Sequence, residues 1–185
     1  MPHVSSLFVP RPALVLGGAR SGKSRFAERF ACESGLARIY LATATAGDDE
    51  MRARIAHHRA QRGDDWRTVE EPLALVDALA REAGEGRVVL VDCLTLWLSN
   101  LMHAARDVEA ASKALADWLR DTRHSVLLVS NEVGLGLVPE TPLGRDFRDA
   151  QGRLNQAIAA AVPNVAFVAA GLPLWLKRES IEEAP

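Results

Sequence analysis

The chain has 185 residues, of which 48% are hydrophobic and 25% are charged, and its formal net charge is -2. This length suits one domain that can bury a core without disulfides or structural metal, and the composition excludes a disordered or fibrous chain. The near balance of charge argues against a broad basic surface, so we expect no nucleic-acid partner. Cys32 and Cys93 lack the spacing of a zinc site, and we interpret both as reduced core residues.

Residues 1–12 contain prolines and no apolar run long enough for a signal peptide. We expect them to form a flexible tail before one domain at 13–178 and a C-terminal tail at 179–185. The longest apolar region, residues 88–102, is interrupted by polar side chains and is too short for a membrane span. A cytoplasmic protein without a membrane partner is therefore the prediction.

Short aliphatic segments alternate with segments of helical periodicity along the chain. The predicted strands are 13–16, 39–42, 88–91, 125–129 and 165–169. The predicted helices are 23–33, 49–61, 73–82, 94–105, 108–120 and 143–161. This alternation predicts a single α/β domain with a mainly parallel sheet and helices on both faces. Residues 66–71 are a candidate edge strand, but their pattern is too weak to decide.

The first glycine-rich segment matches the phosphate-binding pattern GxxxxGK[ST] in full. It consists of Gly17, Gly18, Ala19, Arg20, Ser21, Gly22, Lys23 and Ser24. It follows the first predicted strand and opens the first predicted helix, which is the context that a P-loop requires. Backbone N–H groups would surround the phosphates of ATP or GTP, Lys23 would bridge the β- and γ-phosphates, and Ser24 would bind Mg²⁺. An incidental glycine-rich turn is the weaker interpretation, because pattern and context agree.

Asp92 follows the strand predicted at 88–91. In P-loop proteins an acidic residue at this place holds the Mg²⁺, directly or through water. The alternative is that its carboxylate only caps the helix that follows. Because a P-loop lies upstream in the same predicted sheet, we favour Asp92 as the second metal ligand beside Ser24.

The helix predicted at 49–61 begins with acidic residues and carries His57 and His58 among arginines. A neutral imidazole is a competent nucleophile toward phosphorus, and neighbouring guanidinium groups would hold phosphate oxygens. A covalent nucleotidyl-histidine is therefore chemically reasonable. Spacing alone favours the other interpretation, an exposed basic helix face with two solvated histidines.

Several short segments follow one another in a recognisable order between residues 13 and 177. They are GGARSGKS at 17–24, YLATA at 40–44, DDEM at 48–51, RIAHHR at 54–59, WRTVEEP at 66–72, DCLT at 92–95, SNEVGLGLVP at 130–139, FRD at 147–149 and GRLNQ at 152–156. In this combination the chain resembles the bifunctional adenosylcobinamide kinase/adenosylcobinamide-phosphate guanylyltransferase family of cobalamin biosynthesis.

The resemblance implies two reactions in one P-loop (RecA-like) domain. In the kinase step, ATP or GTP phosphorylates the aminopropanol hydroxyl of adenosylcobinamide. In the transferase step, a histidine attacks GTP to give a guanylyl-histidine and pyrophosphate, and the guanylyl group then passes to adenosylcobinamide phosphate. The product would be adenosylcobinamide-GDP. The resemblance also implies a homotrimer.

Carried across by motif, the nucleophile is His58, with His57 as the second candidate, and Lys23 is catalytic. The other nucleotide contacts that the resemblance implies are Ala42, Thr43, Ala44, Arg59, Ala60, Gln61, Arg62, Glu70 and Asp92. Nothing in the local pattern selects Glu70, which by itself is a surface acid ahead of a proline. For residues 131–139, which follow the fourth predicted strand, contact with the corrinoid is a hypothesis beside a conformational role for the glycines.

Two other functions stay open at this point. One is a simple P-loop kinase of a small metabolite, in which His58 is a surface or phosphate-binding residue and no covalent intermediate forms. The other is a non-catalytic module that senses nucleotides.

Overall fold

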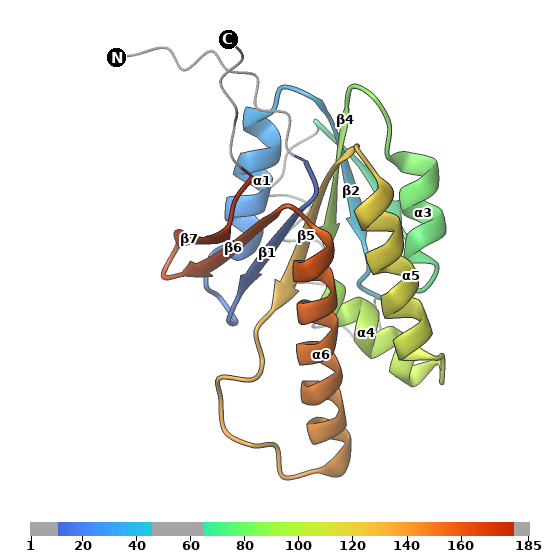
Figure 1. Ribbon diagram of the computed structural model, residues 1–185, viewed down its shortest axis with the longest axis vertical. Helices are drawn as coiled ribbons and strands as arrows, with labels where there is room; N and C mark the ends of the chain where they lie inside the picture. Colours follow the sequence, from blue (N-terminus) through green and yellow to red (C-terminus); the bar gives the residue numbers. More distant parts are fainter. Residues whose placement is uncertain (1–10, 46–64, 180–185) are drawn as a thin grey trace.

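The computed structural model describes residues 11–45 and 65–179, which form one sheet covered by helices (Figure 1). The sheet has seven strands in the order β3-β2-β4-β5-β1-β6-β7. The strands are β1 (Ala13–Gly17), β2 (Ala37–Ala42), β3 (Trp66–Glu70), β4 (Arg87–Asp92), β5 (Ser125–Asn131), β6 (Asn164–Ala169) and β7 (Leu172–Lys177). The helices are α1 (Lys23–Glu33), α3 (Leu75–Glu82), α4 (Leu94–His103), α5 (Val108–Asp121) and α6 (Pro142–Ala161).

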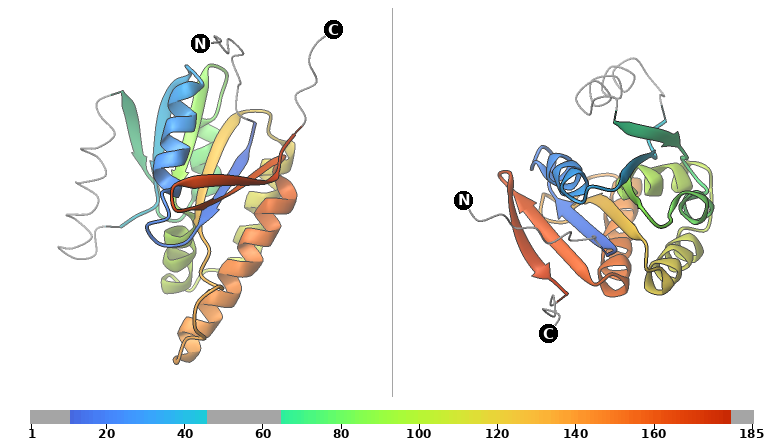
Figure 2. Two further views of the ribbon diagram at one scale, coloured as in Figure 1. Left: turned by 90° about the vertical axis from the view of Figure 1, so that its left-hand side faces the viewer. Right: turned by 90° about the horizontal axis from the view of Figure 1, so that it is seen from above.

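Helices cover both faces of the sheet, as the sequence predicts (Figure 2). On one face, α1 packs on Val15, Leu90 and Val129. On the other face, α3, α4, α5 and α6 enclose a larger core that includes Leu14 and Val91. Because residues alternate along a strand, both sides of β1, β4 and β5 are buried, which explains why these strands are almost wholly apolar.

The five predicted strands are present, and the candidate at 66–71 forms β3, which runs parallel to β2. The helices match except at their ends. Helix α3 begins at Leu75 rather than at residue 73, because Glu71 Oε1 accepts the N–H groups of Leu73 and Ala74 in a turn before the helix. The helix predicted at 49–61 lies outside the described residues.

Strand β7 is an element that the sequence pattern does not predict. It pairs antiparallel with β6 through a turn at Ala170 and Gly171, whose φ angles of 52° and 79° are typical of a two-residue hairpin. Pro173 argues against a strand in the sequence, but an edge strand tolerates a proline. The hairpin tip contacts the glycine-rich loop, since Gly171 N donates to Ser21 O at 2.8 Å.

The prediction that both cysteines lie in the core is wrong for Cys32. Cys93 is buried, whereas Cys32 is exposed. Helix α1 buries Phe26, Ala27 and Ala31, and Cys32 falls on the side of the helix that faces away from the sheet. Within the described part of the chain, no helix combines the length and apolar character needed to cross a bilayer.

Candidate active site

The carboxyl ends of the parallel strands bring the predicted site residues to one edge of the sheet. Ala42 at the end of β2 is in register with Glu70 of β3 and with Asp92 of β4. Gly17 at the end of β1 is in register with Asn131 of β5. Ligands of open parallel sheets bind at this edge, where the strands end and the following loops diverge.

These terminal residues also share a face of the sheet. Tyr40, Leu90 and Val129 pack in the core beneath α1. Successive side chains of a strand point to opposite faces, so the residues two positions later, Ala42, Asp92 and Asn131, project to the α1 face as well. Helix α1 begins with Lys23 directly after the glycine-rich loop, which places the loop, Lys23 and Asp92 on one side of the sheet.

The glycine-rich loop needs glycine at its first position. A Cβ on Gly17 would lie 2.5 Å from both Ser21 Oγ and the carbonyl oxygen of Val168, which is closer than such contacts allow. Gly22 has φ 92° and Arg20 has φ 56°, so the backbone curls through left-handed conformations before α1. This is the backbone form in which successive N–H groups can surround a phosphate.

Lys23 is held against the loop. Its Nζ donates to the carbonyl oxygen of Gly18 at 3.1 Å. Burial lowers the pKa of Lys23, while its coulombic interactions with Cys93 and Asp92 oppose that shift. The effect of Asp92 on this pKa agrees with their common side of the sheet.

Thr43 follows β2 and holds the end of β4. Its Oγ1 donates to the carbonyl oxygen of Cys93 at 2.7 Å and accepts the N–H of Cys93 at 2.9 Å. Asn100 on α4 then joins this loop to the end of β3, because its Nδ2 donates to the carbonyl oxygens of Thr43 and Pro72. The side chain of Thr43 is therefore engaged within the protein, whereas its neighbours Ala42 and Ala44 are partly exposed.

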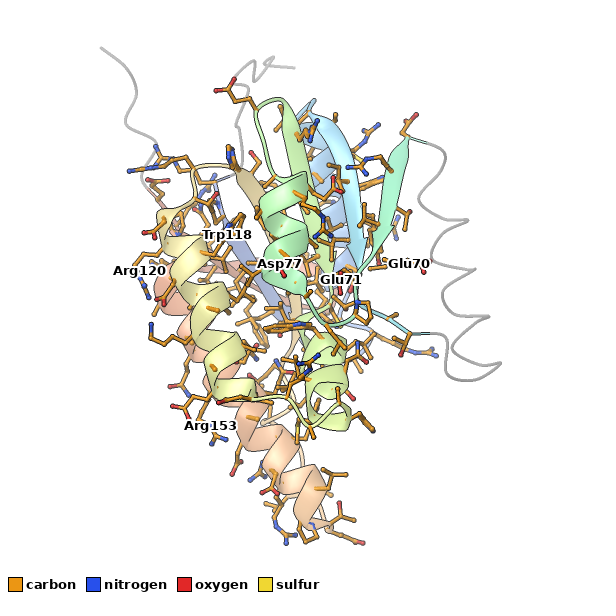
Figure 3. All side chains as sticks on the ribbon, turned by 90° about the vertical axis from the view of Figure 1, so that its right-hand side faces the viewer. Glu70, Glu71, Asp77, Trp118, Arg120 and Arg153 are labelled. Atoms are coloured by element: carbon orange, nitrogen blue, oxygen red, sulfur yellow. The ribbon has the colours of Figure 1, made fainter. Side chains whose placement is uncertain are left out.

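Glu70 and Glu71 lie at the end of β3 (Figure 3). The carboxylate of Glu71 accepts backbone N–H groups and shapes the turn into α3. Glu70 is exposed, and its register with Ala42 places it at the same edge as Asp92. The structure thus separates a structural acid from one that can reach a ligand, a distinction that the sequence does not make.

The histidine segment lies outside the described residues. This applies to His57 and His58 and also to Arg59, Ala60, Gln61 and Arg62. The described chain stops at Thr45, shortly after β2 ends at the carboxyl edge, and resumes at Asp65 before β3. Their assignment as nucleophile and nucleotide contacts stays a prediction.

A buried polar network beneath the carboxyl edge was not among the predicted site residues. Gln151 and Asn155 on α6 hydrogen-bond Ser130, and Asn155 Nδ2 donates to the carbonyl oxygen of Asn131 at 3.1 Å. The sequence signal is a pair of carboxamide side chains four residues apart on the buried face of a helix. Such a pair is rarely buried unless it is hydrogen-bonded.

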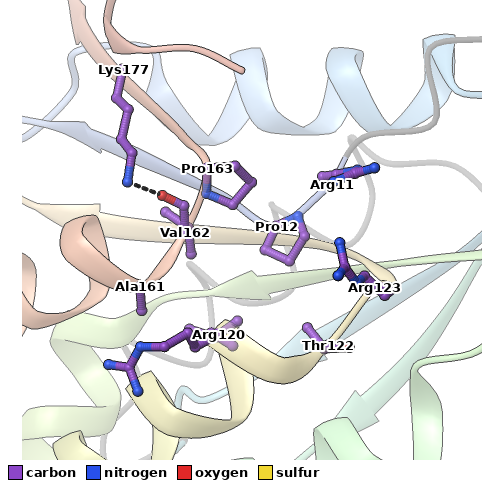
Figure 4. A pocket seen from close by; sticks show the side chains of 10 residues that line it. Arg11, Pro12, Arg120, Thr122, Arg123, Ala161, Val162, Pro163 and Lys177 are labelled. Atoms are coloured by element: carbon purple, nitrogen blue, oxygen red, sulfur yellow. Dashed lines mark hydrogen bonds between the residues drawn. The ribbon is translucent and has the colours of Figure 1, made fainter. Parts of the chain in front are cut away.

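A basic pocket at the opposite edge of the sheet is not a candidate for the same chemistry (Figure 4). Its basic lining residues are Arg11, Arg120, Arg123 and Lys177. Lys177 Nζ donates to the carbonyl oxygens of Ala159 and Val162, where α6 ends, and so neutralises a helix C-terminus. This pocket lies where β1 begins, away from the glycine-rich loop.

Comparison with known proteins gives a family match over most of the chain. Residues 13–176 match the model of the family described as cobinamide kinase / cobinamide phosphate guanyltransferase. The chain is 54% identical over 170 residues to the bifunctional adenosylcobalamin biosynthesis protein CobP of Pseudomonas aeruginosa, covering 91% of this chain and 98% of that protein. It is 39% identical over 179 residues to the bifunctional adenosylcobalamin biosynthesis protein CobU of Escherichia coli K12, covering 89% and 98%.

Solved structures are similar to this chain in fold alone. An ATPase from the type III secretion system of pathogenic bacteria is similar with a TM-score of 0.55 at 9% sequence identity. The match covers 89% of this chain and 56% of that one. The chain therefore shares its fold with that ATPase, and the glycine-rich loop between β1 and α1 agrees with the P-loop domain that the sequence predicts. Together with the full-length matches, the glycine-rich loop and the acidic strand end show that this chain belongs to the cobinamide kinase / cobinamide phosphate guanyltransferase family.

Proposed function

We propose that this chain phosphorylates adenosylcobinamide with ATP or GTP and then transfers GMP from GTP to adenosylcobinamide phosphate, giving adenosylcobinamide-GDP. The observation that carries the proposal is the convergence of Gly17, Lys23 and Asp92 on the α1 face of the carboxyl edge, in a chain that matches this family from residue 13 to residue 176. The simple metabolite kinase and the nucleotide-sensing module are less favoured, because relatives that match over nearly their whole length are named bifunctional biosynthetic proteins.

In the kinase step, the glycine-rich loop holds the triphosphate and Lys23 neutralises charge on its β- and γ-phosphates. The acceptor hydroxyl attacks the γ-phosphorus and the nucleoside diphosphate leaves. Catalysis of this reaction is mainly a matter of positioning and electrostatic stabilisation. Both require a closely packed cradle, and Gly17 lies so near Ser21 and Val168 that a Cβ on it would meet each of them at 2.5 Å.

The oxygen ligands at this edge suit Mg²⁺. The described residues contain no cluster of three or more His, Cys, Asp or Glu side chains that could hold a metal by themselves. Mg²⁺ does not need one, because it keeps several waters and takes one or two protein ligands together with the phosphates. Ser24 and Asp92 would hold it. When bound, the ion would neutralise the charge of the phosphate oxygens.

In the transferase step, an imidazole nitrogen of His58 attacks the α-phosphorus of GTP and pyrophosphate leaves. A phosphate oxygen of adenosylcobinamide phosphate then attacks the same phosphorus and releases the imidazole. Arg59 and Arg62 would hold phosphate oxygens during both displacements. Ala42, Ala44 and Glu70 are the proposed contacts of the guanosine, with the Glu70 carboxylate accepting hydrogen bonds from guanine N–H or ribose O–H groups.

The loop between β5 and α6 is the proposed binding site of the corrinoid. Leu135, Leu137 and Val138 are 82%, 97% and 64% exposed, and the loop begins beside the glycine-rich loop at Asn131. A substrate as large as a corrinoid extends beyond the edge of the sheet, so this loop offers it apolar contacts. Replacing Leu135 and Leu137 by Ser should raise the KM for adenosylcobinamide without changing the affinity for GTP.

A homotrimer in the cytoplasm completes the proposal. The surface feature that supports a homotrimer is a row of leucines on the edge strand β7. Leu172, Leu174 and Leu176 are each at least 60% exposed. Exposed apolar rows of this kind are typical of association surfaces. Replacing Leu174 by Glu should lower the mass that light scattering measures, and an unchanged mass would show that β7 is not the contact surface.

The decisive experiment is mass spectrometry of the intact protein after brief exposure to Mg²⁺ and GTP. We expect an acid-labile guanylyl adduct, peptide mapping that assigns it to His58, and its loss in His58→Ala. His57→Ala is the matched control and should keep the adduct. A protein that phosphorylates adenosylcobinamide but never carries the adduct would be the simple kinase, and one that turns over no nucleotide with cobinamide present would be the sensing module.

A further inference from the structure

Asn131 occupies a central place at the carboxyl edge. It is the last residue of β5, the strand that lies between the P-loop strand β1 and the strand that ends in Asp92. It is in register with Gly17, the first residue of the glycine-rich loop. The next residue binds the same glycine, since Glu132 N donates to the carbonyl oxygen of Gly17 at 3.1 Å.

The backbone of Asn131 is fixed from two helices. Its N–H donates to Thr95 Oγ1 on α4 at 2.8 Å, and its carbonyl oxygen accepts from Asn155 Nδ2 on α6 at 3.1 Å. Asn155 is itself held by Gln151 and Ser130. A residue whose N–H and C=O are both held in this way keeps its Cα–Cβ bond pointing to one face of the sheet.

That direction is toward the α1 face. Ser130 points to the α6 side of the sheet, where it contacts Gln151 and Asn155. Asn131 therefore points to the side of α1, which begins with Lys23, and to the side of Asp92. Its Oδ1 is buried and has no hydrogen-bond partner among the described residues. A buried polar atom without a partner is costly to stability, and at the edge where ligands bind, a ligand can supply the missing hydrogen bond.

A carboxamide suits this position chemically. It offers two N–H donors and one acceptor oxygen. Beside a loop that binds phosphates, the N–H donors suit a phosphate oxygen, and the acceptor oxygen suits the hydrogen of an alcohol. A carboxylate at the same place would repel the phosphates. An alkyl group would bind neither partner.

We propose that Asn131 is a catalytic residue of the kinase step, whose side-chain amide binds the transferred γ-phosphoryl group and the acceptor hydroxyl together. The reaction forms the bond between the acceptor oxygen and the γ-phosphorus and breaks the bond to the bridging oxygen of the nucleoside diphosphate. The hydroxyl proton passes to solvent, and Asn131 neither gains nor loses a proton. Its role is to align the two reactants. The proposal rests on the proposed binding of the triphosphate in the glycine-rich loop.

The two reactions of the family differ in their dependence on such a residue. The kinase step transfers the γ-phosphoryl group, whereas guanylyl transfer to His58 occurs at the α-phosphorus and needs no acceptor alcohol. A contact with the γ-phosphoryl group and the hydroxyl therefore acts on one reaction and spares the other. A purely structural role would affect both.

The test compares Asn131→Ala and the near-isosteric Asn131→Asp with the wild-type chain. The assays are steady-state phosphorylation of adenosylcobinamide by ATP and single-turnover guanylylation by GTP. The kcat of phosphorylation should fall by about 10²-fold in Asn131→Ala, the scale of removing one transition-state donor. It should fall further in Asn131→Asp, whose charge repels the phosphates. Guanylylation should stay within about threefold, which also reports that the variants fold.

The matched control is Asn164→Ala, which removes a buried asparagine at the amino end of β6. It should lower the thermal midpoint and leave the ratio of the two activities unchanged. Unchanged phosphorylation in Asn131→Ala, an equal loss of both activities, or a raised KM for adenosylcobinamide at constant kcat would each overturn the proposal. Lys23→Ala tests the triphosphate placement separately: if that variant keeps full phosphorylation, the proposed function fails, whatever Asn131 does.

Discussion

The side-chain amide of Asn100 on α4 donates to the carbonyl oxygen of Thr43 at 2.7 Å, and this bond connects a helix of one face to the loop after β2. The same nitrogen donates to the carbonyl oxygen of Pro72 at 3.1 Å, after β3. One partly buried amide thus holds the ends of two neighbouring strands. Those ends carry Ala42 and Glu70, the proposed contacts of the guanosine.

Removing this amide should destabilise the fold. Asn100→Leu leaves two backbone carbonyls without their donor, and a buried group left unsatisfied costs about 1–3 kcal/mol. The free energy of unfolding, measured with urea, should fall by about that amount. Ser99→Ala on the same helix is the matched control and should stay within about 0.5 kcal/mol of the wild type. A loss in Asn100→Leu no larger than in the control would show that the two carbonyls find other donors.

Alanine should be harmful at Gly17 and harmless at Gly18, the first two glycines of the loop. Gly17→Ala places its Cβ 2.5 Å from the carbonyl oxygen of Val168, a backbone atom that cannot move away cheaply. We expect a lower thermal midpoint and loss of detectable GTP binding in calorimetry. Gly18→Ala meets no described atom within 4 Å and should keep the midpoint of the wild type. Equal midpoints for the two variants would contradict this account of the loop.

Nucleotide affinity should fall at alkaline pH because Lys23 loses its proton there. Burial lowers the pKa of Lys23 below its ordinary value of 10.5 in the nucleotide-free protein. Phosphate charge favours the protonated form, so binding raises this pKa, and affinity is full below the lowered pKa and lost as the pH rises through it. Titration with a fluorescent GTP analogue at increasing pH measures the midpoint of this loss of affinity. Lys23→Arg should move the alkaline limb upward, since a guanidinium keeps its charge, and an unchanged midpoint would assign the effect to another group.

The two cysteines should differ sharply in reactivity. Burial raises the pKa of Cys93 from 9.0 to about 11, so its reactive thiolate is scarce near neutral pH, whereas Cys32 is exposed. An alkylating reagent at mildly alkaline pH should label Cys32 in the native protein and both cysteines in urea. Cys32→Ser should then take up no label while folded. Rapid labelling of Cys93 in that variant would mean that the end of β4 opens readily.

The same shift predicts how stability depends on pH. The folded pKa of Cys93 is higher than the unfolded value, so the native state favours the protonated thiol. Its contribution is fully present below pH 9.0 and is lost as the pH rises from there to about 11. Cys93→Ser should flatten the dependence in this range, as urea unfolding at several pH values would show. An unchanged slope would assign the alkaline loss of stability to other groups.

Much of the site could be predicted because its signals are local. The glycine-rich loop, the strand before it and the helix after it are contiguous, so one segment contains both the motif and its context. Asp92 was identified in the same way from the strand that it ends. Glu70 required the family resemblance, because its position at the edge depends on the pairing of β3 with β2, which lies outside its own segment.

The sequence by itself determined five of the strands, the described helices and the glycine-rich loop, since periodicity and turn chemistry act between residues that are close along the chain. Only the tertiary structure decided that Asn131 stands opposite Gly17, that Asn100 joins Thr43 to Pro72, and that a hairpin tip reaches Ser21. These contacts join residues from about 30 to 150 positions apart. Strand order and register create them, and no local pattern encodes which distant segments become neighbours.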